Sequence, residues 1–335
     1  MSRTTRRRHE HRLPGSDVSG IGLRPAMEAD LPACAALWRD AINDYQARLN
    51  QPLIPDEAGS TARLGRLHAH TLATDPDRFV VASRPEADGR DAIVAFGSAV
   101  VRDGVWFLSM LFVRPDLQGA GLGRRVLERL LPAEELGLIL ATATDSAQPI
   151  SNALYAAAGI APRIPLWSVS GGPGGGALPR LPWGVTVVPF AEIAADAGAG
   201  RGHAMLVEAV DELDREVLGF SHPADHRHLR MGESVGFLYV GGDGRPVGHG
   251  YASPAGRIGP VAVRDPALLA AVVGDLLTRV EPRGGQLVWV PGDAGELLGD
   301  LLRSGFRIDG FPVLLSWSRP FADFARYVPF SPGLL

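Results

Sequence analysis

The stretch from Phe107 to Leu131 constrains the fold more than any other part of the chain, because it joins an apolar run, a glycine-rich turn and an amphipathic segment. The apolar run, Phe107 to Val113, fits a buried strand. Pro115 ends it, since proline cannot continue a central ladder. Apolar residues then recur at helical spacing as far as Leu131, and Pro132 disfavours a longer helix. We therefore expect a strand, a glycine turn and a helix, in that order.

The turn from Gln118 to Gly123 has the chemistry of a phosphate site. A helix N-terminus carries unpaired backbone N–H groups and a partial positive charge, and glycines let a bulky anion approach them. Arg124 and Arg125 lie in the first helical turn, where the helix dipole favours acids. An anion bound nearby would account for them. On spacing alone, a plain glycine-rich turn with two solvated arginines is the alternative.

Two other phosphate-binding motifs fit poorly. A P-loop requires lysine, and the chain contains none. A dinucleotide-binding turn requires a third glycine where Arg124 stands, and an acid roughly 20 residues further on, of which there is no clear sign.

The turn resembles motif A of the GCN5-related N-acetyltransferases (GNATs), which reads Gln/Arg-x-x-Gly-x-Gly/Ala. Gln118, Gly121 and Gly123 match it after Val113-Arg114-Pro115. The resemblance implies acetyl-CoA as a cosubstrate, with its pyrophosphate on the backbone amides of the turn and its pantetheine arm along the preceding strand. The acetyl-CoA contacts expected on this basis are Leu111, Phe112, Val113, Gln118, Gly119, Ala120, Gly121, Leu122, Gly123 and Arg124.

A second segment, from Gln148 to the C-capping Gly159, is similar to motif B of the same family, commonly Asn-x-x-Ala-x-x-Leu-Tyr-x-x-x-Gly-Phe. Gln148 stands in place of the Asn and Ile160 in place of the Phe. The resemblance implies cosubstrate contacts by Gln148, Asn152 and Tyr155, and makes the Tyr155 phenol the general acid for the departing thiolate. A buried aromatic without catalytic role is the alternative for Tyr155.

The general base is harder to identify. The strand from Phe107 to Val113 contains no acid, and Ser109 alone is a poor base, so a water held by backbone carbonyls is the default. Asp40, Asp44 and Glu57 could attract a cationic amine or be solvated surface residues. The apolar tail, residues 320–335, resembles that of the "enhanced intracellular survival" acetyltransferases, which implies that the terminal carboxylate of Leu335 acts as the base. A tail packed on the second domain is the alternative.

The resemblance implies an α/β (α+β) fold with two GNAT-like domains, each a mixed, mostly antiparallel sheet flanked by helices. The pattern places a disordered basic tail at 1–20, a catalytic domain at 21–170, a Gly/Pro-rich linker at 171–183 and a degenerate domain at 184–319. The second copy lacks the glycine turn, and Leu301 replaces Tyr155. We expect this copy to provide structural support, dimerisation or a substrate wall.

Composition limits the possible partners. The net charge of −4 gives no general sign of nucleic-acid or membrane binding, although the arginines of the first 20 residues leave a nucleic-acid arm open. Cys34 is the sole cysteine, which favours a reducing compartment, and we expect it to be a small residue of the core. We therefore expect a cytoplasmic protein. The composition as a whole indicates a GC-rich bacterium. The His-rich run HPADHRH, from His222 to His228, has a loop-like pattern that favours a solvated or interdomain cluster, so we expect no metal.

The sequence therefore predicts an acetyl-CoA-dependent N-acetyltransferase whose first domain is active. The acetyl group would pass to a primary amine of a small molecule or peptide by direct attack in a ternary complex. The alternative is a non-catalytic acyl-CoA-binding or regulatory protein, because no base is evident. Either way we expect a monomer or homodimer without a nucleic-acid or membrane partner.

Overall fold

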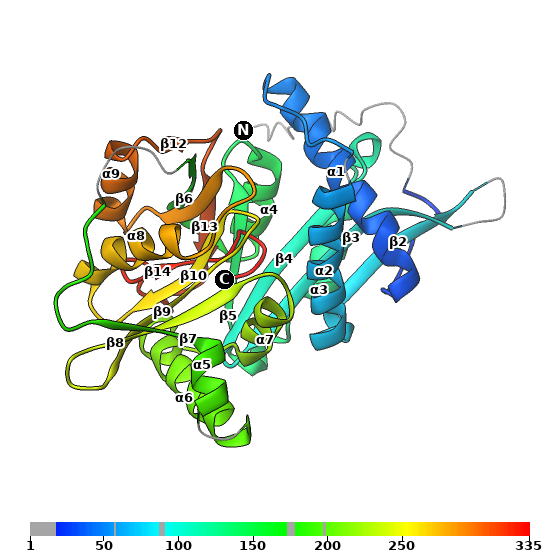
Figure 1. Ribbon diagram of the computed structural model, residues 1–335. Coiled ribbons are helices and arrows are strands. Elements are labelled where there is room, and N and C mark those ends of the chain that lie inside the picture. Colours follow the sequence, from blue (N-terminus) through cyan, green and yellow to red (C-terminus); the bar gives the residue numbers. More distant parts are fainter. Residues whose placement is uncertain (1–17, 57, 87–90, 173–177, 197–198) are drawn as a thin grey trace, which may run out of the picture. The chain divides into compact units, whose positions relative to one another are not determined.

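The computed structural model describes residues 18–335 except 57, 87–90, 173–177 and 197–198 (Figure 1). These residues form two compact units. Unit 1 contains the described residues up to 99 together with 110–131, and unit 2 contains residues 100–109 and the described residues from 132 onward. The predicted tail at 1–20 lies largely outside the described residues, and so do residues 173–177 of the predicted linker at 171–183.

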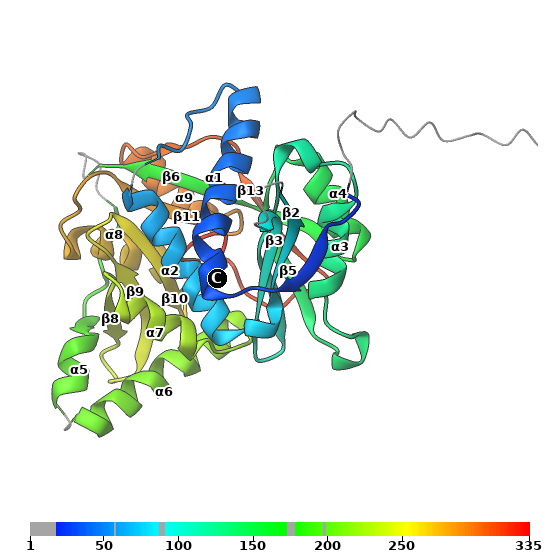
Figure 2. The ribbon, with the colours of Figure 1, turned by 90° about the vertical axis from the view of Figure 1, so that its right-hand side faces the viewer.

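Unit 1 is an antiparallel sheet covered by helices on both faces (Figure 2). Phe79, Val81 and Phe96 pack against α1 and α2 on one face, whereas Gly97, the next residue along β3, faces α3. This alternation follows from the two-residue period of a strand. The elements are β1 (Gly22–Pro25), α1 (Leu31–Arg48), α2 (Ala58–Thr74), β2 (Phe79–Pro85), β3 (Asp91–Arg102) and α3 (Leu122–Leu130), with short 3-10 turns at Glu28–Asp30, Pro76–Arg78 and Pro115–Leu117.

Unit 2 holds the remaining elements, and β4 (Val105–Val113) runs from unit 2 into unit 1 as β3 runs the other way. The helices are α4 (Pro149–Ala157), α5 (Phe190–Asp196), α6 (Ala199–Leu218), α7 (Pro223–Met231), α8 (Leu269–Arg279) and α9 (Gly295–Arg303). The strands are β5 (Ile139–Asp145), β6 (Ala161–Gly171), β7 (Thr186–Pro189), β8 (Val235–Val240), β9 (Pro246–Ala252), β10 (Arg257–Val263), β11 (Gln286–Pro291), β12 (Arg307–Ile308), β13 (Val313–Trp317) and β14 (Tyr327–Val328). Short 3-10 turns lie at Glu134–Leu136 and Pro266–Leu268.

The sheet of unit 2 has the order β4–β5–β13–β6–β11–β10–β9–β8–β7. Its pairs are antiparallel except β4 with β5 and β10 with β11, which are parallel. The fold is therefore the predicted mixed, mostly antiparallel α/β type. Strand β13, from near the end of the chain, lies between β5 and β6. Strands from both sides of the predicted linker thus share one sheet.

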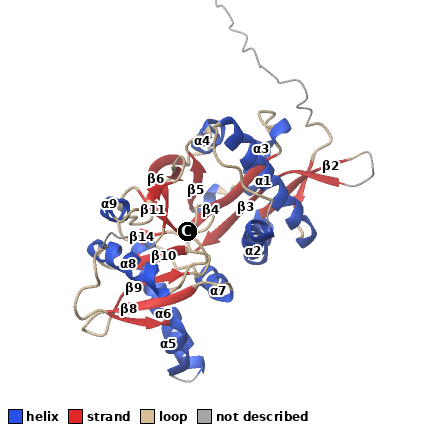
Figure 3. Ribbon diagram, turned by 45° about the horizontal axis from the view of Figure 1, so that its top comes forward, coloured by secondary structure: helices blue, strands red, loops and turns tan. Residues whose placement is uncertain are grey.

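Helices cover both faces of β8, β9 and β10 (Figures 1 and 3). Phe237 and Tyr239 of β8 face α8, and Leu238 between them packs with α5 and α6. Tyr251 of β9 also lies on the α6 side. His249, two residues before Tyr251, shares this face, because alternate strand residues point the same way.

Most predicted elements have the expected type. Asp30, the residue before α1, makes no side-chain cap there, because its carboxylate accepts hydrogen bonds from Arg24 (2.6 and 2.8 Å) and from the Met27 amide (2.8 Å). Near the end of the chain, β12 and β13 are separated around Gly310, which has φ = 64°. The expected loop at the His-rich run is instead α7.

Candidate functional site

The turn after β4 is closed by its own side chains. Arg114 pairs with Asp116 at 2.7 Å, and Pro115 begins the 3-10 turn Pro115–Leu117. The Gln118 side-chain amide then donates to the carbonyl oxygen of Val113 at 3.0 Å. This bond returns the chain to the end of β4 and fixes the entry to the glycines, as motif A would require.

Two glycines of the turn hold conformations that other residues rarely adopt. Gly119 has φ = 79° and Gly121 has φ = 86°. A Cβ at either position would meet nothing within 4 Å, so backbone conformation rather than crowding requires glycine. Gly121 is also the N-cap of α3, and no side chain caps that end. The first N–H groups of α3 therefore meet no capping side chain, which is the arrangement an anion can use.

The other predicted contacts of this region lie in the expected elements. Leu111, Phe112 and Val113 end β4, and Leu122, Gly123 and Arg124 open α3. Arg125 donates to the carbonyl oxygen of Ile21 at 3.0 Å, so this side chain ties α3 to β1. It is not simply a solvated arginine of the turn.

Helix α3 lies directly on the sheet of unit 1. Its apolar face is buried, and an added Cβ on Gly97 would come within 2.7 Å of Leu130 and 2.9 Å of Val126. The missing side chain lets the helix approach closely, and this close packing holds the turn rigidly at its start.

Helix α4, in unit 2, has the features expected of motif B. Gln148 is its N-cap residue, and the Asn152 amide donates to the carbonyl oxygens of Asp145 (3.0 Å) and Gln148 (2.9 Å). Tyr155 is buried, and burial raises the pKa of its phenol above the ordinary value. The phenol is therefore protonated at neutral pH, as a proton donor must be.

Ser109, the weak candidate base, is buried, and its hydroxyl donates to the carbonyl oxygen of Gly333 at 2.6 Å. Of the acids that could attract a cationic amine, Asp44 pairs with Arg48 at 2.7 Å, and Asp40, largely exposed, lies 3.5 Å from Arg39. Glu57 falls outside the described residues. Ser109 and Asp44 are therefore engaged, whereas Asp40 is largely solvated.

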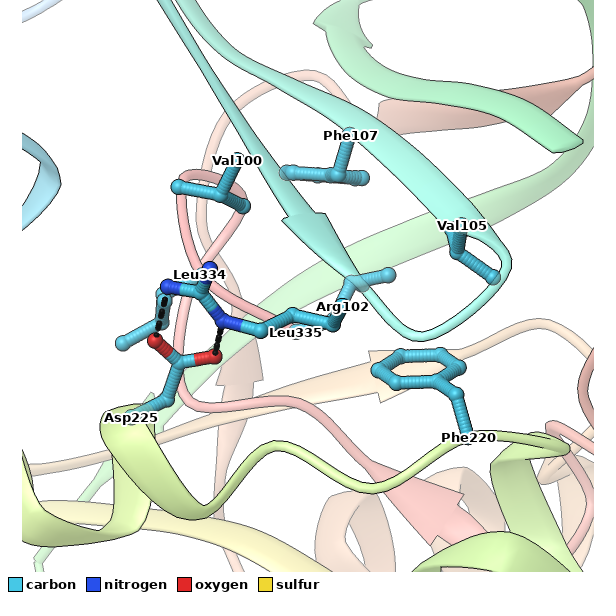
Figure 4. A pocket seen from close by; sticks show the side chains of 8 residues that line it. All are labelled: Val100, Arg102, Val105, Phe107, Phe220, Asp225, Leu334 and Leu335. Atoms are coloured by element: carbon cyan, nitrogen blue, oxygen red, sulfur yellow. Dashed lines mark hydrogen bonds and ion pairs between the residues drawn. The ribbon is translucent and has the colours of Figure 1, made fainter. Parts of the chain in front are cut away.

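The C-terminal segment is packed within unit 2. Strand β14 pairs with β10, and Leu335 is 6% exposed. Leu334 and Leu335 line a small cavity with Val100, Val105, Phe107 and Phe220, and Figure 4 shows the ion pair of Arg102 and Asp225 beside it. The described end of the chain thus reaches the part of β4 that belongs to unit 2, at Ser109.

The His-rich run is not a solvated cluster, because His222 and His226 are each 1% exposed. Burial opposes charge on His222, but the carboxylates of Asp214 and Asp225 outweigh it and raise the pKa to about 10. Burial instead lowers the pKa of His226 to about 4. Sequence reasoning missed this cluster because Asp214 and His249 belong to α6 and β9. Only the four-residue spacing of His222 and His226 signalled a shared face.

Cys34 is buried in α1, as predicted for a small core residue. Burial raises the pKa of its thiol to about 12, which suppresses thiolate reactivity.

Comparison with known proteins identifies the class. Residues 38–160 match the Acetyltransferase (GNAT) family, a range that includes the glycine turn and Tyr155. No curated protein sequence matches the chain significantly. The chain therefore carries a GNAT acetyltransferase domain.

Solved structures extend the likeness to almost the whole chain. A Pyrococcus horikoshii protein assigned as an acetyltransferase has 15% identity and a TM-score of 0.68, covering 98% of this chain and 100% of that one. A GCN5-related N-acetyltransferase from Sphaerobacter thermophilus has 18% identity and a TM-score of 0.59, with coverage of 92% and 99%. A tandem GNAT protein of the clavulanic acid biosynthesis pathway has 15% identity and a TM-score of 0.51, with coverage of 90% and 99%.

The fold of the chain is thus similar to that of tandem GNAT proteins, and its second half lacks the glycine turn. Together the family match and the fold support acetyl-CoA-dependent acetyl transfer as the general class of reaction. In the described part of the chain, no helix combines the length and the hydropathy needed to cross a membrane.

Proposed function

We propose that the chain is an N-acetyltransferase that moves the acetyl group of acetyl-CoA to a primary amine of a small molecule or peptide. The observation that carries this proposal is the turn between β4 and α3. Gly119 and Gly121 hold left-handed conformations there, and no side chain caps the first N–H groups of α3. Such a helix start suits a pyrophosphate. The residue range of the family match also includes this turn.

The proposed reaction is direct attack in a ternary complex. The neutral amine attacks the thioester carbonyl carbon, a C–N bond forms and the C–S bond breaks. Tyr155 gives its phenolic proton to the departing CoA thiolate, a role that rests on the motif B resemblance and on a phenol that burial keeps protonated. The amine passes its excess proton to a base.

For that base we propose a water held by backbone carbonyls, because Ser109 already donates to Gly333 and the strand Val105–Val113 has no acid. The Leu335 carboxylate stays a second prediction. One glycine added after Leu335 moves a terminal carboxylate by about 3.5 Å and keeps the side chain. If Leu335 supplies the base, kcat falls at least about tenfold. Leu335→Ala, which keeps the carboxylate, is the control, and an unchanged kcat in the extended chain contradicts the prediction.

The experiment that tests the cosubstrate is a calorimetric titration with acetyl-CoA, combined with detection of CoA release over an amine panel. Gly121→Glu places a carboxylate in the turn and should weaken acetyl-CoA binding at least about 100-fold by charge repulsion. Gly244→Glu is the matched control, since Gly244 also has positive φ (81°) and open space around its Cα but lies in the β8–β9 hairpin. Equal affinities of the two variants would contradict the pyrophosphate site.

The alternative remains a non-catalytic acyl-CoA-binding or regulatory protein, which the acid-free strand β4 favours. It predicts calorimetric binding of acetyl-CoA that depends on Gly121, without CoA release for any amine in the panel. Release above the rate of buffer hydrolysis, lost in Gly121→Glu, would exclude it.

A further inference from the structure

A cluster of three histidines surrounds one carboxylate in the interior of unit 2. Asp214 comes from α6, His222 from the start of α7, His226 from within α7 and His249 from β9. Each of these four side chains is at most 1% exposed. Four potential metal ligands are therefore gathered in a region without solvent.

Their ring nitrogens point toward the Asp214 carboxylate. His226 Nε2 lies 2.7 Å from one carboxylate oxygen, and His249 Nε2 lies 2.7 Å from the other. His222 Nε2 lies 3.2 Å from the oxygen that His226 contacts. One ligand atom each from Asp214, His226 and His249 lie within 4.8 Å of one another. An ion between these atoms could therefore be reached by all three side chains.

The outer nitrogen of His226 is arranged as that of a metal-bound histidine usually is. His226 Nδ1 lies 2.9 Å from the Tyr251 hydroxyl, and His222 Nδ1 lies 3.5 Å from the Asp225 carboxylate. Arg102 holds that carboxylate with two hydrogen bonds of 2.8 and 2.7 Å. Hydroxyls and carboxylates behind ligating imidazoles fix the ring orientation and strengthen the ligand.

Protein hydrogen bonds account for only part of this cluster. Among the described residues, neither ring nitrogen of His222 nor Nδ1 of His249 has a well-aligned hydrogen-bond partner. A buried polar atom without a partner costs free energy. His222 is 1% exposed, so bulk water does not reach its ring nitrogens, and the nearest acceptors are the Asp214 and Asp225 carboxylates at 3.2 and 3.5 Å. The cluster thus holds His222 by long ion pairs rather than by aligned hydrogen bonds.

We propose that Asp214, His226 and His249 bind one Zn²⁺ ion, with His222 placed to supply a fourth ligand once it has released its proton. Imidazole nitrogens and one carboxylate oxygen suit Zn²⁺, whereas Ca²⁺ and Mg²⁺ prefer oxygen ligands. Tetrahedral Zn²⁺ bonds of about 2.0–2.1 Å place ligand atoms about 3.3 Å apart. The contacts of 2.7 Å would widen by about 0.6 Å on binding, a small side-chain adjustment.

The site would be structural. It joins α6, α7 and β9, and its buried ligands leave no exposed position for a substrate. A closed site of this kind adds its binding free energy to folding. The GNAT reaction does not need it, so the inference is independent of the proposed acetyltransferase activity.

The first test is metal analysis of the full chain without an affinity tag, purified without chelator from zinc-supplemented medium. We expect about one zinc per chain by mass spectrometry, and a melting temperature lowered by at least about 5 °C after chelation and restored by Zn²⁺ alone. The Co²⁺-substituted protein should show the visible absorption of tetrahedral cobalt. Less than about a tenth of an equivalent of zinc, with no thermal response to Zn²⁺ or chelator, overturns the site.

The second test uses variants. Asp214→Asn and His249→Gln should each lose zinc, and His203→Ala, an exposed histidine on the same helix as Asp214, should retain it. The wild-type measurements decide the proposal if a variant fails to fold. Full zinc retention in both ligand variants, or stoichiometric iron in place of zinc in the wild type, overturns the assignment.

Discussion

The two halves of the chain contain the same crossover, but the turns that lead into the two helices differ. In the first half β4 leads to α3, and in the second β10 leads to α8. Each helix lies over a glycine of the strand beside the one that leads to it, Gly97 of β3 or Gly250 of β9. A Cβ on Gly97 would come within 2.7 Å of Leu130, and a Cβ on Gly250 within 2.6 Å of Leu276. The close approach of helix to sheet is thus common to both copies.

The turns differ in what precedes the helix. Gly121 opens α3 in a left-handed conformation without a capping side chain. In the second copy the Asp265 carboxylate accepts a hydrogen bond from the Ala267 amide at 2.9 Å, and the 3-10 turn Pro266–Leu268 continues into α8, which also has no side-chain cap. A carboxylate of the chain itself thus occupies the turn before α8, where the first copy has glycines. Leu269, Ala270 and Ala271 are also buried.

The comparison separates architecture from chemistry. Packing over a glycine preserves the crossover in both halves, whereas a few residues between strand and helix decide whether an anion can bind there. The catalytic residue proposed for α4 also differs between the two halves. Leu301 of α9, which is fully buried, stands where the first half has Tyr155.

The largest expected effect is on the proposed acid. Tyr155→Phe keeps the ring and removes the proton donor, so kcat should fall about 100-fold or more, with the Kd for acetyl-CoA little changed. Steady-state kinetics and calorimetry measure the two quantities. Tyr239→Phe, in β8 of the second copy, removes a hydrogen bond to Asp275 (2.9 Å) and should leave kcat intact. Equal kcat values for Tyr155→Phe and the wild type would exclude the role of Tyr155.

The shared glycines should respond alike. Gly97→Ala and Gly250→Ala each push a Cβ against a helix leucine and should lower the free energy of unfolding by about 2–3 kcal/mol. Urea unfolding measures both. Gly65→Ala in α2, where an added Cβ meets nothing within 4 Å, should instead stabilise by about 0.5–1 kcal/mol. A loss at Gly97 without one at Gly250 would show that the two helices are not held in the same way.

Each half of the chain contains a buried histidine, and the two histidines have opposite surroundings. His222 has carboxylates beside it, while His68 in α2 faces the rings of Phe79 and Phe96 at 5.8 and 5.3 Å. Burial lowers the pKa of His68 to about 4. Below about pH 6.5 the unfolded chain binds a proton that the folded chain does not. Stability from His68 is therefore complete above that pH and decreases as the pH falls toward 4.

Between pH 7 and pH 5, protonation of His68 in the unfolded chain should lower the free energy of unfolding by about 2 kcal/mol. Urea unfolding at both pH values should show a smaller loss for His68→Phe than for the wild type. His70→Ala, on the same helix and half-buried, should behave as the wild type. An unchanged pH dependence in His68→Phe would mean that His68 does not titrate in this range.

The smallest effect concerns the carboxylate at the second helix. Asp265→Ala removes the bond to the Ala267 amide and should lower stability by about 1 kcal/mol. It should not create acetyl-CoA binding, because the turn has no left-handed glycine and the start of α8 is buried. Thermal unfolding with and without acetyl-CoA tests both statements in one experiment. New saturable acetyl-CoA binding in a Gly121→Glu, Asp265→Ala double variant would contradict this account.

Local patterns predicted most elements of the fold. The strand from Phe107 to Val113, the glycine turn and the helix that follows it depend on dihedral preferences and side-chain spacing within a few residues. The position of β13 between β5 and β6 could not be predicted in this way. A strand with a two-residue period fits many partners, and pairing is chosen by contacts between segments more than a hundred residues apart.

The candidate sites divide along the same line. The sequence by itself determined the glycine turn and the Tyr155 helix, since each is one short segment whose backbone or spacing defines its chemistry. Only the tertiary structure brought Asp214 and His249 to His226, and placed the last residues beside Val100 and Phe107. Burial decided which of these side chains came together. The apolar face of a strand or helix is visible in the sequence, but which polar side chains share the interior depends on how all the elements pack.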